Sequence, residues 1–230
     1  MSDRDSYISL VTSLPGPERL FLAKQPPLSR LRLEKRLASL EPEDRTLLAE
    51  LEHFMAWGSY SMGDSDQTSI TRAKALLSRL ESSTLRKIVT ERLDLRAAIA
   101  GLRMRRRGDP APTAPWSASR LTRHIVQHWT DPTFELDARL PWIGEALRLL
   151  EKQDPLGLER FVLDVTHRQL KRHGARHSFD FEAVVIYVLQ WSIFERWARS
   201  DGRGASARFE SLTRAALADF QALDLEAFSR

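Results

Sequence analysis

Histidines are the side chains of this chain best suited to acid–base or metal chemistry, and five of the six fall into two groups. His124 and His128 are four residues apart, which places them on one face of a helix at the spacing of a zinc-protease pair. Ile125 follows His124, where such a protease carries its catalytic glutamate, so this pattern is incomplete. The second group lies near the end of another predicted helix and consists of His167, His173 and His177. We favour hydrogen-bonded or dipole-stabilised histidines, with a metal-dependent enzyme as an alternative.

The densest run of positive charge reads Arg103-Met-Arg-Arg-Arg107. Such a run can contact phosphates or an acidic protein surface. A helix C-terminus followed by Gly108 explains the same residues without a partner, because arginine suits the negative end of the helix dipole. Both interpretations stay open, and the predicted partner-binding residues are Arg103, Arg105, Arg106 and Arg107.

Tryptophans and a few charged residues in the second half are the remaining candidates. At helical spacing in a helical protein, Trp116, Trp129, Trp142, Trp191 and Trp197 are expected in the core rather than on a stacking platform. Glu182, Glu195 and Arg196 flank an apolar stretch, and we interpret them as a structural ion pair. The sequence has no glycine-rich phosphate loop, nucleophile elbow or paired-carboxylate motif. We therefore predict no catalytic residue, no cofactor and no bound metal.

The central element of the predicted fold is the stretch from Phe179 to Arg199. From Ala183 to Phe194 only a glutamine and a serine interrupt the apolar residues, so a helix here would be apolar on every face. The run is too short for a membrane span and too long for an ordinary strand. It predicts a helix buried among other helices, with Ser178 or Asp180 as its N-cap.

Around this helix the pattern predicts an all-α bundle of about eight or nine helices. Capping or first-turn residues open many of these helices. The predicted starts include Ser29, Pro42, Thr68 or Ser69, one of Ser82, Ser83 and Thr84, Ser117, Pro141 and Asp154. The last predicted helix spans about 205–228. Tyr7–Leu14, which is rich in β-branched residues, predicts a short extended segment near the N-terminus. The proline-rich turn at 108–115 predicts a boundary between a lobe at 1–108 and a lobe at 109–230.

The basic residues are unusual in kind, since 29 of the 35 are arginine and the acidic residues number 31. Most arginines therefore have a potential partner, as on an ion-paired helical surface rather than a nucleic-acid binder. Cysteine is absent, which excludes disulfides and thiolate chemistry. The first residues show no apolar signal segment, so we expect a cytoplasmic protein.

Several segments together resemble an uncharacterised bacterial family encoded with V-type (A/V-type) ATPases. The N-terminal likeness is Tyr7–Leu14 followed by Gln25-Pro-Pro-Leu28, and the middle one is Glu91-Arg-Leu-Asp-Leu-Arg96 followed by Ala100-Gly-Leu-Arg103. The C-terminal likeness comprises Leu140-Pro-Trp142, Phe179–Tyr187, Trp191 and Glu195-Arg-Trp197. The order and spacing of these segments cover nearly the whole chain.

That family is similar, more distantly, to the V-type ATPase component named C, which is named d in eukaryotes. The resemblance implies a funnel-like, all-α, non-catalytic component that couples the central shaft to the membrane rotor ring. The implied partners are the shaft subunits and the ring, and the implied location is peripheral, at the inner face of the cell membrane. This chain is shorter than those relatives. A basic helical module that binds nucleic acid or regulates another protein is the alternative function.

Overall fold

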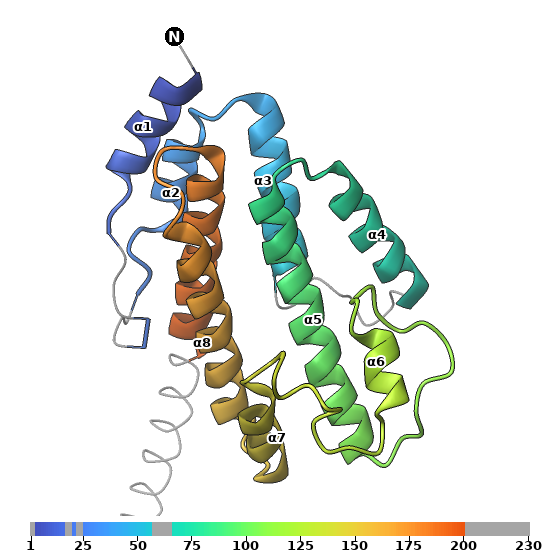
Figure 1. Cartoon of the computed structure of the whole chain (residues 1–230). Helices are drawn as coiled ribbons and strands as arrows, with labels where there is room; N and C mark the ends of the chain where they lie inside the picture. The colour runs from blue at the N-terminus through green and yellow to red at the C-terminus, as the bar shows by residue number, and fades with distance from the viewer. Residues whose placement is uncertain (1–2, 17–19, 22–24, 57–65, 201–230) are drawn as a thin grey trace, which may run out of the picture.

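The computed structural model describes residues 3–16, 20–21, 25–56 and 66–200, which form nine helices and no strand, as predicted (Figure 1). The first eight helices are α1 (Asp3–Ser13), α2 (Arg30–Leu37), α3 (Pro42–Met55), α4 (Asp66–Arg79), α5 (Ser83–Arg106), α6 (Thr122–Gln127), α7 (Ile143–Glu151) and α8 (Pro155–Gly174). Residues 181–200 are also helical, and we call them the central helix.

Most of the predicted helix starts are confirmed by their caps. The hydroxyls of Ser29 and Ser82 accept hydrogen bonds from the amides of the third residues along, at 3.4 and 3.3 Å. Asp154 and Asp180 do the same with their carboxylates, at 2.7 and 2.9 Å. Pro42 begins α3, where its missing N–H leaves no hydrogen bond unmade. The serine and aspartate side chains each accept a hydrogen bond from an otherwise unpaired amide at a helix start, and the proline has no amide N–H to pair.

The extended segment predicted at Tyr7–Leu14 is wrong, because these residues belong to α1 and the turn after it. Tyr7, Leu10, Val11 and Leu14 all pack against the main core, and their spacing is the i, i+3, i+4, i+7 pattern of a helix. The Tyr7 hydroxyl also donates to the Asp44 carboxylate of α3. Packing on one face thus overrides the β-propensity of these residues.

The helix predicted to start at Ser117 and to reach Trp129 is shorter than expected. It covers only α6, which begins at Thr122 and ends at Gln127. Ser117 instead closes a turn, where its hydroxyl accepts from the Ser119 amide at 3.2 Å. The helix predicted at 205–228 lies outside the described residues.

Two apolar clusters form the interior. The first packs the N-terminal helices around the central helix, and the second packs α6, α7 and the loop between them against α5 and α8. Helix α5 belongs to both, because Leu85 to Leu93 enter the first cluster and Leu95 to Leu102 enter the second. Figure 1 shows α5 running the length of the bundle with α6 and α7 near its C-terminal end. The division into lobes 1–108 and 109–230 stays a prediction.

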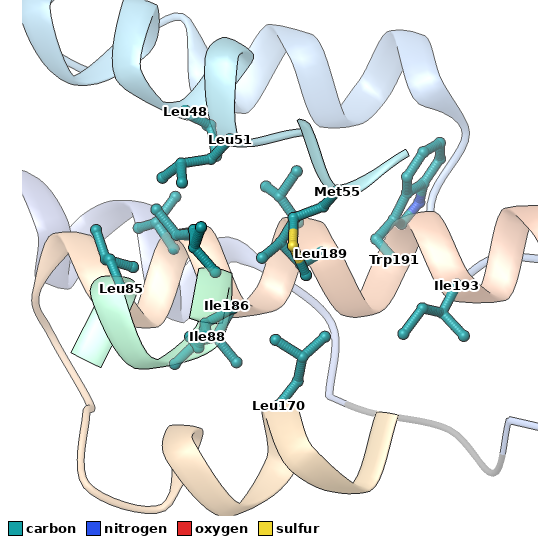
Figure 2. Packing of buried hydrophobic residues seen from close by; sticks show 14 of the residues in the cluster. Leu48, Leu51, Met55, Leu85, Ile88, Leu170, Ile186, Leu189, Trp191 and Ile193 are labelled. Carbon is teal, nitrogen blue, oxygen red and sulfur yellow. The ribbon is translucent and has the colours of Figure 1, made fainter. Parts of the chain in front are cut away.

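The central helix is buried as predicted. None of the residues from 181 to 198 is classed as exposed, and Trp191 is only 2% exposed. Figure 2 shows Leu51 and Met55 of α3 on one side of Leu189, and Leu170 of α8 on the other. Within the described residues, no helix combines the length and apolar character that crossing a membrane requires.

Candidate functional site

Three arginines of α5 and Arg107, which follows its last residue, lie on one face of the helix. Arg92, Arg96, Arg103 and Arg107 follow one another at intervals of four, seven and four residues, which is the repeat of a single helical stripe. At 1.5 Å per residue, the stripe from Arg92 to Arg107 is about 22 Å long. Arg92 is buried, so the accessible positive charge forms a line from Arg96 to Arg107 rather than a point.

This stripe borders a cavity of about 710 Å³, which we call the α5 groove. Its walls come from α4, α5, α8, the central helix and residues 116–118. The four arginines of the stripe are joined by Arg196, whereas Asp66 and Glu159 supply the acidic groups that line it. Apolar side chains lie between the charges, among them Ile70, Ile99, Met104, Trp116 and Leu158. The volume falls within the range of protein ligand sites.

At the inner end of the α5 groove, two arginines hold the C-terminus of α3. Arg92, only 2% exposed, donates to the Met55 carbonyl at 2.9 Å. Arg96 donates to the carbonyls of Phe54 and Ala56 at 3.0 and 2.7 Å, and its guanidinium lies 5.5 Å from the centre of the Phe54 ring. The last carbonyls of a helix lack internal partners and form the negative end of its dipole. These two cations therefore cap α3 from the side.

At the outer end, the predicted basic run divides between two faces. Arg103 and Arg107 line the α5 groove, and both side chains are exposed. Arg107 pairs with Asp109 at 2.6 Å, whereas Arg103 makes no side-chain hydrogen bond or ion pair with any described residue. Arg105 donates instead to the Asp131 carbonyl, and Arg106 is exposed without lining the groove. The structure thus brings two of the four predicted partner-binding residues to one site.

A second cavity of about 480 Å³ meets the α5 groove at three shared residues, Arg92, Glu159 and Arg196. Glu159 accepts from Arg196 at 2.7 Å and from the Ser200 hydroxyl at 3.2 Å. Arg196 therefore forms an ion pair, as predicted, but its acidic partner is Glu159 of α8 rather than Glu182 or Glu195. Glu195 pairs with Arg199 on the central helix itself.

A further cavity, of about 530 Å³, lies against α5, α7 and α8 and is also rich in arginine. Its charges are largely neutralised within the chain. Arg120 pairs with Asp94 at 2.9 Å, Arg172 with Glu91 at 3.1 Å and Arg168 with Asp164 at 2.8 Å. In the α5 groove, by contrast, the exposed Arg103 makes no ion pair with a described residue, so this groove is the better candidate for an acidic partner.

The histidine pair of α6 is engaged within its own loop. The rings of His124 and His128 stack with centroids 4.3 Å apart. One nitrogen of His124 lies 3.0 Å from the Phe134 carbonyl, and one of His128 lies 3.1 Å from the Glu135 carboxylate. The amides of Glu135 and Thr133 bind the Asp131 carboxylate and lower its pKa. Both histidines therefore have structural contacts.

In the other histidine group, His173 and His177 contact different partners. His173 meets Glu91 at 3.1 Å, while His177 lies between the Thr84 hydroxyl at 2.9 Å and Asp180 at 2.7 Å. Among the described residues, His177, Asp180 and Glu182 are the one set of three potential metal ligands close together. They sit at the N-terminus of the central helix, where the dipole opposes a cation and where Asp180 already caps the helix. This geometry favours a capping role.

Sequence reasoning missed Arg92 and Arg96 as members of the site. Their spacing from Arg103 and Arg107 was visible within one predicted helix, and plotting that helix as a wheel would have aligned all four. No family model, no curated protein and no solved structure matches this chain.

Proposed function

We propose that this chain is a non-catalytic helical subunit of a bacterial V-type ATPase that couples the central shaft to the membrane rotor ring. The proposal begins from the resemblance of segments along nearly the whole sequence to the family encoded with these ATPases. One structural observation is consistent with the proposal: two of the segments that carry the resemblance contact each other. The Trp191 indole donates to the Leu28 carbonyl at 2.8 Å, which joins two of the resembling segments across 163 positions.

The middle resembling segment, Glu91–Arg96, is a junction of the fold. Glu91 pairs with His173 and Arg172 of α8, and Arg92 and Arg96 cap α3. Asp94, 3% exposed, accepts from the Ser119 hydroxyl at 2.7 Å. These contacts give the segment a role in the architecture, which fits the proposed non-catalytic subunit.

Rigidity is the physical property that torque transmission needs. Two helices of this protein, α5 and the central helix, contribute buried residues to continuous apolar clusters along much of their length. Interiors packed at protein density deform little under load. The helical bundle thus fits a coupling role better than a role that requires an opening and closing active site.

Co-purification tests the proposal. The tagged full-length chain is expressed with the V-type ATPase subunits of the same organism, and the material retained at low and at moderate salt is identified by mass spectrometry. We expect the shaft subunits and the rotor ring in stoichiometric amounts. A chain that retains neither at either salt concentration would rule out this function.

The second candidate is a basic helical module that binds nucleic acid, which the arginine stripe of α5 favours. A phosphate-binding surface loses affinity steeply as salt rises, because binding releases condensed counterions. Titrating random DNA at several salt concentrations separates the two candidates. A micromolar affinity with a steep salt slope, without co-purification of ATPase subunits, would favour the nucleic-acid module.

A further inference from the structure

We propose that the α5 groove binds an acidic, amphipathic helix of a partner protein. The inference does not depend on the ATPase assignment, since it is drawn from the length, charge and apolar lining of the groove.

The length of the arginine stripe selects an extended occupant. Arg92 is buried, so the part of the stripe open to a partner runs from Arg96 to Arg107, about 16 Å along the helix axis. A helix of about 11 residues, or three turns, has that length. A small anion would contact one or two of these arginines and leave the rest of the groove empty.

The charge of the groove selects an acidic occupant. Five arginines and two acidic residues line it, and Glu159 is already paired with Arg196. Arg103, in the outer half, is exposed and makes no ion pair with a described residue. Arg107, one turn further, is 63% exposed and shares only a surface pair with Asp109. Acidic residues one turn apart on a partner helix would match these two guanidinium groups.

The apolar surface between the arginines favours a protein helix over nucleic acid. Ile99, Met104, Trp116 and Leu158 lie among the charged residues that line the groove. An amphipathic helix with an apolar stripe buries such surface and places its acidic residues at the edges. A nucleic-acid backbone has nothing apolar to bury there, and the two inner arginines already bind the carbonyls at the end of α3.

The test uses the full-length chain and a synthetic probe. The probe is a labelled helical peptide of about three turns, held helical by a side-chain bridge, with a leucine stripe flanked by glutamates. A second peptide carries lysine at every glutamate position. Fluorescence anisotropy measures the binding of each peptide, and labelled random single-stranded DNA is titrated in parallel.

Two variants of α5 provide a matched pair. Arg103→Glu reverses a charge inside the groove, whereas Arg106→Glu makes the same change on the same helix outside it. Both residues are exposed, so neither change should alter the helical circular dichroism or the melting temperature. We expect the acidic peptide to bind the unmodified chain, Arg103→Glu to weaken binding about tenfold and Arg106→Glu to leave it within about twofold.

Several results would overturn the proposal. Equal weakening by the two variants would show attraction to net charge rather than to the groove, and equal binding of the lysine peptide would exclude charge selection. Absence of peptide binding would exclude a helix-binding groove. DNA binding that Arg103→Glu lowers, without peptide binding, would assign the groove to nucleic acid. A dimer of the chain that Arg103→Glu dissociates would assign it to a second copy.

Discussion

The buried guanidinium of Arg92 donates to the backbone carbonyl of Met55 at 2.9 Å, across 37 positions of the chain. The bond fixes the end of α3 against the middle of α5. Arg92 lines both the α5 groove and the neighbouring cavity, which Met55 also lines. An arginine, a residue type normally found on the surface, thus holds two helices together in the interior.

Replacing Arg92 should destabilise the protein. Arg92→Met keeps the aliphatic stem but removes the donor, so the Met55 carbonyl loses a charge-assisted hydrogen bond in a buried position. We expect a loss of about 2 kcal/mol in the free energy of unfolding, measured by urea denaturation. Arg103→Met, the same change at an exposed position of α5, should cost less than about 0.5 kcal/mol. Equal losses in the two variants would contradict the capping role.

The hydrogen bond from the Trp191 indole to the Leu28 carbonyl should also contribute to stability. Trp191→Phe removes the donor, leaves the carbonyl unpaired and opens a small cavity at a side chain that is 2% exposed. We expect a loss of about 2–3 kcal/mol by thermal or urea denaturation. Trp197→Phe is the control, because that indole lies at 9% exposure and donates to no described residue. A larger effect at Trp197 would show that the bond to Leu28 matters little.

Sequence periodicity predicted the helices well because most of them are amphipathic or wholly apolar. The central helix could be identified from one nearly continuous apolar run, and Ser29 and Asp154 marked helix starts by their chemistry alone. The α1 segment was missed because its β-branched residues suggested a strand. Its helical face became clear only from the contacts of Tyr7 with α3.

The contacts around the candidate site were harder to predict, because charged residues near the middle of α5 are buried. Arg92 and Asp94 lie at 2% and 3% exposure near the middle of α5, where composition alone places both on the surface. Their partners are the Met55 carbonyl, 37 positions away, and the Ser119 hydroxyl, 25 positions away. No local pattern encodes such distant contacts. The density of positive charge identified the run Arg103–Arg107. Its division between two faces became visible only when the structure showed which side of α5 faces the groove.

Asp94 accepts hydrogen bonds from one buried and one exposed side chain, so the two contacts can be compared for their contribution to stability. It accepts from Ser119, which is 7% exposed, and from Arg120, whose side chain is 62% exposed. Ser119→Ala should cost about 1–2 kcal/mol, since the carboxylate loses a buried donor. Arg120→Ala should cost less than about 1 kcal/mol, because solvent screens the exposed cation.

A double-mutant cycle that pairs Asp94→Asn with each of these changes isolates the two coupling free energies. We expect the coupling with Ser119 to exceed the coupling with Arg120. The reverse order would mean that the ion pair, rather than the buried hydroxyl, holds the loop before α6 against α5.

His167 of α8 should make stability depend on pH. Burial lowers its pKa below the ordinary value of 6.5; nearby Lys171 lowers it further and Asp164 opposes the shift. Its ring packs edge-on against Phe194 of the central helix, with centroids 5.8 Å apart. The unfolded chain therefore takes up the proton at a higher pH than the folded chain does. The free energy of unfolding should fall as the pH drops below about 6.5, until the folded-state pKa is reached.

One such group changes the free energy of unfolding by at most about 1.4 kcal/mol per pH unit. Urea denaturation between about pH 7.5 and pH 5 measures the slope, and His167→Leu should reduce it. His53→Gln, at an exposed position of α3, should leave the slope unchanged. If His167→Leu kept the full slope, the acid sensitivity would belong to other groups. If it instead steepened the loss toward low pH, the folded protein would favour protonated His167, contrary to its burial against Phe194.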